Sequence, residues 1–194
     1  MGIIMELFKD TKKRLTDLIE KCSDKKPLFA LFVHGEQAID PLSIQEIDMR
    51  TITDPSGGPI KYSTNYVYSS RTEKEETRLY LEGFIVTFSS QVFSEQGKVK
   101  SIAMIPLVKK IEQCIEKYVA LLNDKTGGTI FRVWCTIFNA EGYCTYSEAA
   151  FASSSINSKE VVFDDWTISY DNPKDGANRI LCQLYNTFGD KYPQ

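Results

Sequence analysis

Three segments of the chain carry apolar residues at a spacing of three to four positions, with polar and charged residues between them. They span residues 4–22, 106–122 and 173–188. Apolar residues at this spacing line one face of an α-helix. The second and third segments also begin with proline, which is common in the first helical turn. The sequence therefore predicts three amphipathic helices, the last of them capped at Asp171 or Asn172.

The other regular patterns along the chain are those of β-strands. Residues 28–34, LFALFVH, form a continuous apolar run, which is typical of a strand that is buried on both faces. Further runs predict strands over 42–52, 61–71, 78–93, 129–138, 143–152 and 160–170. Runs of strands with the helices set apart predict an α+β fold, with a mainly antiparallel sheet packed against the helices. A chain of 194 residues fits a single domain of this kind, 1–194.

Two pairs of the predicted strands flank short polar segments and therefore predict β-hairpins. The charged segment TEKEE at 72–76 separates the first pair, so we expect an extended hairpin over 61–93 that protrudes from the domain. A turn that contains glycine separates the strands 129–138 and 143–152, which predicts a second hairpin. The polar segment SEQGK at 94–98 is expected to break the chain.

The charge of the chain limits the classes of partner. The formal net charge is −3, and lysines near the N-terminus alternate with acidic residues, so we expect no basic surface for nucleic acid. No apolar run approaches the roughly 18 residues that a transmembrane helix needs. The N-terminus also lacks the basic start and long apolar core of a signal peptide. We therefore expect a cytoplasmic protein that does not bind a membrane.

Cys135 and Cys144 lie nine positions apart and raise the question of a disulfide bond. If a three-residue loop joins their strands, the two side chains point to opposite faces of the sheet. If a two-residue loop joins them, the residues share a face but lie roughly 13 Å apart along the strands. A disulfide needs Cα atoms within about 7 Å, so neither pairing allows one. We expect reduced, structural thiols at all five cysteines, residues 22, 114, 135, 144 and 182.

Few residues are candidates for catalysis or metal binding. His34 is the only histidine, and its place at the end of a buried strand favours a structural role over a catalytic one. Asp164 and Asp165 could pair their carboxylates, but adjacent strand residues point to opposite faces. The Gly-rich segments lack the phosphate-binding patterns. We therefore expect no enzyme activity, metal or cofactor. The alternative is a small-ligand-binding protein or enzyme with a pocket near His34 or Asp164/Asp165.

Tyrosines give the strongest indication of a contact surface. The strand 61–71 is expected to place four side chains on one face, and the return strand adds a fifth: Tyr62, Thr64, Tyr66, Tyr68 and Tyr80. Residues 62–70 contain no charge, although edge strands normally carry protective charges. An uncharged strand of this kind suits pairing with a strand of a partner chain. A strand inside the sheet of its own domain explains the pattern as well, so both interpretations stay open.

The predicted order of elements over residues 4–170 resembles the α+β plan of tail-terminator and neck-ring proteins of tailed bacteriophages. The shared features are the N-terminal helix, the protruding hairpin 61–93, the helix 106–122 and the hairpin after it. Those proteins form rings by extending their sheets between subunits. The resemblance implies a cyclic oligomer in a virion, assembled in the host cytoplasm, without catalysis. Its partners would be copies of itself and neighbouring structural proteins.

Without that resemblance, the residues favour a non-enzymatic assembly subunit that forms a symmetric oligomer. A homodimeric interaction module remains the alternative within this class, because the sequence alone does not distinguish a contact between like surfaces from one between unlike surfaces.

Overall fold

The computed structural model describes residues 26–47, 59–63, 65–72, 74–145 and 155–189, together with Lys13 and Asp17, which are both helical. Several predictions therefore fall wholly or largely outside the described residues. They concern the helix over the rest of 4–22, the second half of the strand 42–52, most of the loop 53–59, Thr64, and most of the strand 143–152.

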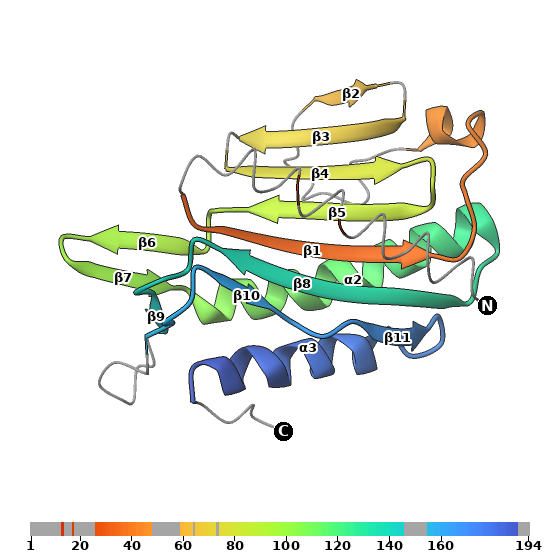
Figure 1. Ribbon diagram of the computed structural model, residues 1–194. Coiled ribbons are helices and arrows are strands. Elements are labelled where there is room, and N and C mark those ends of the chain that lie inside the picture. Colours follow the sequence, from red (N-terminus) through yellow and green to blue (C-terminus); the bar gives the residue numbers. More distant parts are fainter. Residues whose placement is uncertain are drawn as a thin grey trace.

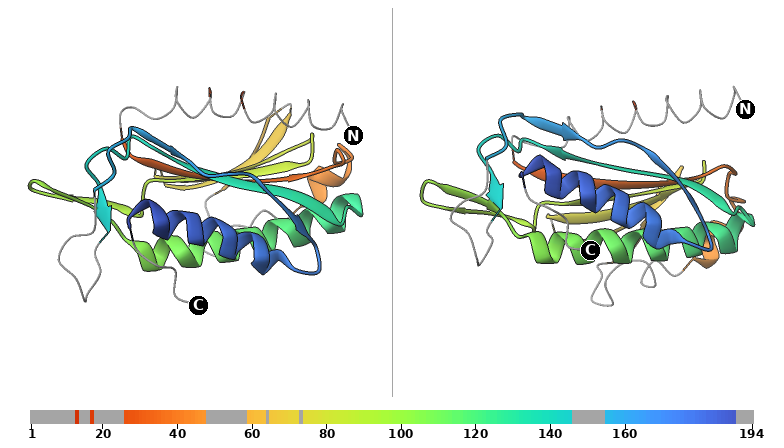
Figure 2. Two further views of the ribbon diagram at one scale, coloured as in Figure 1. Left: turned by 60° about the horizontal axis from the view of Figure 1, so that its bottom comes forward. Right: turned by 90° about the horizontal axis from the view of Figure 1, so that it is seen from below.

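The described chain forms two layers, a β-sheet of eight strands and two helices that cover one of its faces (Figures 1 and 2). The helices are α2 (Met104–Thr126) and α3 (Pro173–Thr187), and they lie side by side. Every strand pair in this main sheet is antiparallel. The predicted α+β class, with a mainly antiparallel sheet packed against helices, is confirmed.

The main sheet has the strand order β10-β8-β1-β5-β4-β3-β2, and β11 also pairs with β8. Its strands are β1 (Leu28–Gly35), β2 (Ile60–Tyr62), β3 (Tyr66–Thr72), β4 (Glu75–Tyr80), β5 (Phe84–Ser89), β8 (Ile130–Phe138), β10 (Glu160–Val162) and β11 (Trp166–Ser169). β1 lies in the middle, with Phe32 opposite Val86 of β5 and Trp134 of β8. The residues from Phe29 to Val33 are 0% exposed, so the prediction of a strand buried on both faces is confirmed.

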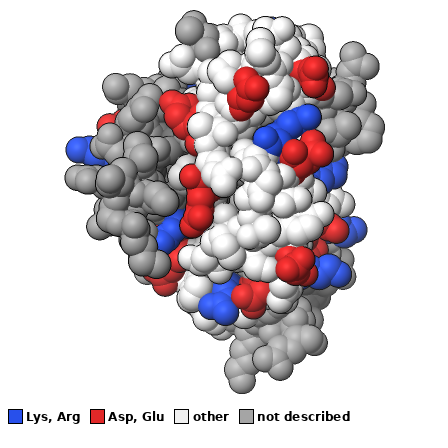
Figure 3. Space-filling model, turned by 90° about the vertical axis from the view of Figure 1, so that its right-hand side faces the viewer, with Lys and Arg blue, Asp and Glu red and all other residues white. Residues whose placement is uncertain are grey.

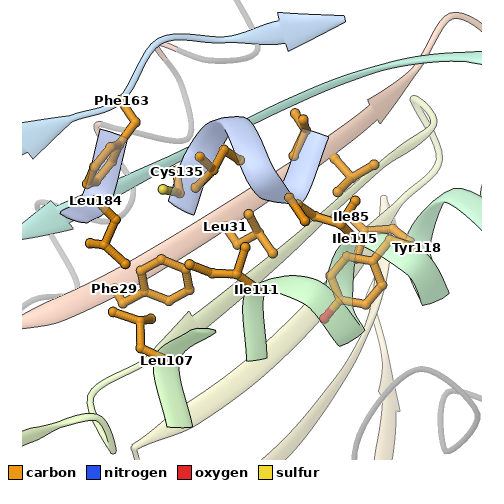
Figure 4. Close-up of a cluster of buried hydrophobic side chains, with 14 of the residues drawn as sticks. Phe29, Leu31, Ile85, Leu107, Ile111, Ile115, Tyr118, Cys135, Phe163 and Leu184 are labelled. Atoms are coloured by element: carbon orange, nitrogen blue, oxygen red, sulfur yellow. The ribbon is translucent and has the colours of Figure 1, made fainter. Parts of the chain in front are cut away.

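Alternation along β1 divides the buried residues into two clusters. The larger cluster lies between the sheet and the helices and contains Phe29, Leu31 and Val33. Figure 4 shows part of it, with side chains from α2 and from the central strands packed together. The smaller cluster lies on the other face, where Phe32 and Trp134 stack with their ring centroids 4.3 Å apart.

The strands between residues 61 and 89 belong to the main sheet, and the segment 61–93 does not form one long hairpin. The predicted reversal near 72–76 is present, since β3 and β4 are paired. The predicted strand 78–93 is divided by a second reversal, after which β5 pairs back on β4 with Tyr80 opposite Phe84. Gly83 makes this turn possible, because its φ of 85° lies in the left-handed region. The apolar residues on both sides of Gly83 concealed the turn in the sequence.

The hairpin that projects from the sheet lies elsewhere, where the sequence indicated only a break at 94–98. It consists of β6 (Phe93–Gln96) and β7 (Val99–Ile102), joined by a turn at Gly97 with φ of 62° (Figure 1). β9 (Cys144–Thr145) pairs with β7 in parallel. The predicted pairing of 129–138 with 143–152 is therefore wrong for the described part of the second strand. The edge of β8 that it would have used pairs with β10 and β11.

The predicted strand 42–52 begins instead as a short 3-10 helix, η1 (Ser43–Glu46). Asp40 causes this turn, because its Oδ1 accepts a hydrogen bond from the Leu42 N–H at 2.9 Å. The Ser43 hydroxyl also donates to the Asp40 carbonyl at 2.9 Å. Ile44 and Ile47 are buried, so the apolar spacing is real, but it follows a helical turn and not a strand.

Both described helices agree with the sequence. α2 contains the predicted 106–122 and ends at Gly127, whose φ is 70°. α3 covers the predicted 173–188 except for its last residue, with Asn172 as its N-cap. The predicted strand 160–170 is interrupted between β10 and β11, where the Phe163 N–H donates to the Cys135 carbonyl at 3.1 Å.

Candidate functional site

β2 is the last strand of the main sheet, and it carries Tyr62 at its end. A tight turn joins it to β3, closed by a hydrogen bond of 2.8 Å from the Ser63 N–H to the Tyr66 carbonyl. In the resulting register Tyr62 lies opposite Val67, and Lys61 lies opposite Tyr68. Opposite residues share a face of the sheet.

Tyr62 therefore lies on the helix-facing side of the sheet with Val67, whereas Tyr66 and Tyr68 lie on the other side. The prediction that these tyrosines occupy one face is wrong, because the turn reverses the chain and ends the strand alternation. Thr64 is outside the described residues. The sequence showed no glycine or proline at this turn, which explains why it was missed.

A cavity of about 590 Å³ lies beside β2. Three parts of the chain form it: η1 with Pro41 before it, the β2–β3 turn with its flanking residues, and Leu81 in the β4–β5 turn. Backbone hydrogen bonds join these parts, from the Leu81 N–H to the Asn65 carbonyl at 3.1 Å and from the Ile39 N–H to the Leu81 carbonyl at 2.8 Å. The described lining residues carry no charge, and tyrosine, glutamine and serine are the polar residue types among them.

We call this surface the tyrosine edge; it comprises β2, η1 with Pro41, residues 63 and 65–67, and Leu81. Two large apolar side chains beside the cavity are exposed, Tyr62 at 58% and Leu42 at 75%. Acidic residues follow the lining in sequence at Glu46 and Glu82. Figure 3 views this end of the molecule and shows a broad uncharged surface, with both acidic and basic side chains around it.

On the other side of the sheet, aromatic rings form a row across β3, β4 and β5. Tyr66 lies 5.7 Å from Tyr68 and 5.0 Å from Tyr80, measured between ring centroids. Tyr80 in turn stacks on Phe84 at 4.2 Å. Arg78 lies 5.2 Å from the Tyr66 ring and forms an ion pair with Glu76. Burial raises the pKa of Tyr80, and its hydrogen bond with Arg78 opposes that rise. Three of the predicted contact tyrosines are thus brought together, although half-buried.

His34 lies at the end of β1, with Arg132 opposite it on β8. Burial lowers its pKa to about 4, which a hydrogen bond with the Glu82 backbone partly opposes and which the nearby Arg132 charge reinforces. Its ring packs edge-on against Phe84 at 6.0 Å. The imidazole is therefore neutral at pH 7 and held by its surroundings, as expected of a structural histidine.

Asp164 and Asp165 have separate partners. The Asp165 carboxylate pairs with the Arg132 guanidinium at 3.1 Å. Asp164 accepts a hydrogen bond of 2.7 Å from the Gln183 side chain of α3, and its own N–H donates to that side chain at 3.1 Å. Arg132 thus lies between Asp165, its ion-pair partner, and His34, which is opposite it on β1. Asp164 joins the segment between β10 and β11 to α3. None of the three is among the described lining residues of the cavity beside β2.

The described cysteines 114, 135, 144 and 182 are free. Cys135 is buried, and burial raises the pKa of its thiol. The Cys144 thiol donates to the Lys100 carbonyl at 3.2 Å. The expectation of no disulfide between Cys135 and Cys144 agrees with the structure, but its premise was wrong, because β9 pairs with β7 and not with β8. Cys22 lies outside the described residues.

Two further findings concern the described part of the chain only. It contains no cluster of three or more His, Cys, Asp or Glu side chains that could bind a metal ion. None of its helices is both long enough and apolar enough to cross a bilayer. Comparison with known proteins adds no family assignment: no family model, curated protein or solved structure matches the chain.

Proposed function

We propose that this chain is a non-enzymatic assembly subunit that associates with copies of itself and with neighbouring structural proteins through the tyrosine edge. One observation carries the proposal: the sheet ends at β2 beside a neutral cavity, with Tyr62 and Leu42 largely exposed. Exposed apolar groups of this size gathered at the end of a sheet are typical of contact surfaces.

The edge supplies backbone groups as well as apolar side chains. Among the described residues β2 pairs only with β3, so its outer N–H and C=O groups can pair with a strand of another chain. β2 has three residues, and one of them, Lys61, is charged. Such a short edge limits unspecific pairing. The contact therefore needs the side chains around the cavity to add affinity and specificity.

In its most specific form, the proposal is a ring-like tail or neck component of a virion. What supports this form is the resemblance in element order alone, and of its four shared features the helix 106–122 is the one that the described residues keep unchanged. The hairpin that projects is formed by β6 and β7 and not by 61–93. Within 61–93, β2 forms the edge of the main sheet, and β3, β4 and β5 lie inside it. A homodimeric interaction module remains the alternative within the same class.

The proposal is tested by measuring the mass of the purified chain by light scattering over a range of concentrations. We expect an oligomer of the 22.1 kDa chain that dissociates in Tyr62→Lys. Tyr170→Lys is the matched control, because Tyr170 is also exposed, at 42%, but follows β11 at the opposite edge of the sheet. If the purified wild-type chain stays monomeric at all concentrations, self-association is contradicted.

A second candidate function is the binding of a small uncharged molecule in the cavity of about 590 Å³. The volume falls within the range of small-molecule sites, roughly 300–1,000 Å³, and the lining combines apolar walls with a few polar groups. This candidate replaces the expected pocket near His34 or Asp164/Asp165. A fragment screen by thermal shift tests it, with Leu81→Trp as a variant that fills the cavity. Hits that stabilise the wild type and this variant equally would contradict binding there.

A further inference from the structure

We propose that the β6–β7 hairpin of one copy docks on the tyrosine edge of the next copy and inserts Val99 into the cavity. This inference rests on the self-association proposed above and names the two surfaces that meet. They are different surfaces, and they lie at opposite ends of the molecule: the hairpin tip projects from one end, and η1 with the β2–β3 and β4–β5 turns forms the other (Figure 1).

The hairpin has the properties of a contact element. Residues 94–100 are all exposed, and the strands β6 and β7 pair with each other along their length. Within the described part of the chain, only the last two residues of β7 pair with a further strand, β9. An isolated two-stranded hairpin is at best marginally stable in water, so a projecting one gains stability from a partner surface. Val99 is 44% exposed near the tip and offers an apolar side chain to such a surface.

The charges of the two surfaces are complementary. Lys98 and Lys100 flank Val99 and are exposed. Glu46 and Glu82, also exposed, each follow a lining residue of the cavity in sequence, Gln45 and Leu81. Lys61 of β2 lies on the other face of the sheet, with its ammonium 5.6 Å from the centroid of the Tyr68 ring. Val99 with Lys98 beside it at the turn therefore suits a neutral cavity with glutamates next to its lining residues.

Two groups on the hairpin already have partners within the chain. Glu95 accepts a hydrogen bond of 2.6 Å from the Tyr143 hydroxyl. The Lys100 ammonium lies 5.5 Å from the centroid of the Tyr143 ring. Lys98, at the turn itself, is therefore the lysine that we expect to contact the acidic residues of the next copy. When two copies meet through unlike surfaces, the hairpin of one copy and the cavity of the other stay available. Further copies can therefore add, and the assembly either continues as a filament or closes into a ring.

The first test compares Val99→Asp with Val162→Asp by light scattering of the full chain. Both valines are exposed on strands, at 44% and 57%, but Val162 lies on β10, away from the hairpin. We expect Val99→Asp to abolish the oligomer and Val162→Asp to leave it unchanged. If the wild type is oligomeric and both variants behave alike, the docking inference is overturned while self-association stands. A monomeric wild type overturns both.

The second test exchanges charges between the surfaces. We expect Lys98→Glu, and separately the double variant Glu46→Lys with Glu82→Lys, to weaken self-association about tenfold or more, because each places like charges together. Copies of the two variants that alternate have complementary charges at every contact, so the mixture associates more strongly than either variant alone. Lys174→Glu, at an exposed lysine of α3, is the control and leaves association unchanged. Failure of the mixture to recover, with both variants folded, rejects this pairing of surfaces.

Discussion

The Tyr118 hydroxyl forms a hydrogen bond with the Thr87 hydroxyl inside the interface between α2 and the main sheet. Thr77 on the neighbouring strand completes the group, 2.8 Å from the Thr87 oxygen and 3.4 Å from that of Tyr118. All three side chains are 3% exposed or less. Because each hydroxyl has a partner, this polar group is satisfied within the core and fixes the position of α2 against β4 and β5. Figure 4 shows Tyr118 among the apolar side chains around it.

Removing the Tyr118 hydroxyl should destabilise the protein modestly. We expect Tyr118→Phe to lower the free energy of unfolding by about 1–2 kcal/mol, because the two threonines can still bond to each other. Urea unfolding at pH 7 measures the effect. Tyr170→Phe is the control and should cause no change, since Tyr170 is 42% exposed. Equal stability of Tyr118→Phe and the wild type would show that the buried hydroxyl contributes nothing.

His34 should make the protein less stable in acid. Burial lowers its folded-state pKa to about 4 from the ordinary histidine value of 6.5. Between these pH values the unfolded chain binds more protons, so stability rises with pH. The contribution of His34 is present above pH 6.5 and is lost as the pH falls to 4, by on the order of 3 kcal/mol.

Urea unfolding of the wild type and of His34→Gln at several pH values between 7 and 4 tests this. Glutamine cannot take up a proton, so we expect the variant to lose less stability than the wild type over that interval. His34 is the only histidine, and the carboxylates titrate in both proteins, so the difference between the two curves isolates the imidazole. Parallel curves would contradict the lowered pKa.

The described thiols should differ strongly in reactivity. Cys182 is exposed, whereas Cys135 is buried and has a raised pKa, so little of its thiol is ionised near neutral pH. We expect iodoacetamide to label Cys182 in the native protein and Cys135 only in urea, as followed by peptide mass spectrometry. Cys182→Ser should remove the rapid native labelling of that peptide and leave Cys135 protected. Comparable native labelling of both peptides would be inconsistent with the burial of Cys135.

Alanine substitutions at two glycines should have different costs. Both residues have positive φ, 85° at Gly83 and 62° at Gly97. A Cβ at Gly83 would lie 2.0 Å from the Gln37 carbonyl oxygen, whereas one at Gly97 meets no described atom within 4 Å. We expect Gly97→Ala to cost about 1 kcal/mol for its backbone conformation and Gly83→Ala about 3 kcal/mol or more.

Urea unfolding of both glycine variants gives the comparison, and Gly97→Ala serves as the control for backbone strain alone. Equal costs would mean that the β4–β5 turn yields to the added methyl group. The result bears on the tyrosine edge, because the same turn carries Leu81 into the cavity.

The tyrosine edge was only partly predictable. The uncharged segment 62–70 includes residues beside the cavity, since Tyr62 and Tyr66 are among its lining residues. The sequence did not indicate Leu81, because the β4–β5 turn that contains it lies within an apolar run. It did not indicate Gln45 either, because the pattern at 42–52 predicted a strand where η1 forms. The Asp40-Pro41 pair was the available signal for η1, since both residues favour turns.

The helices α2 and α3 and the interior strands β1 and β8 follow from the local sequence alone. Their apolar patterns are long enough to distinguish a helix, with a period of 3.6 residues, from a strand, with a period of 2 residues. Local patterns therefore fix what each of these segments becomes, and with it the α+β class.

Contacts between distant segments determine which strands are neighbours, which hairpin projects and which face each tyrosine occupies. β9 has two described residues and pairs with β7, although β8 is closer to it in sequence. The pairing of short strands depends on hydrogen bonds and packing between residues far apart in the chain. A shift of one residue at a turn moves every side chain of the following strand to the other face of the sheet. The cavity beside β2 arises from three such distant segments, so it exists only once the chain has folded.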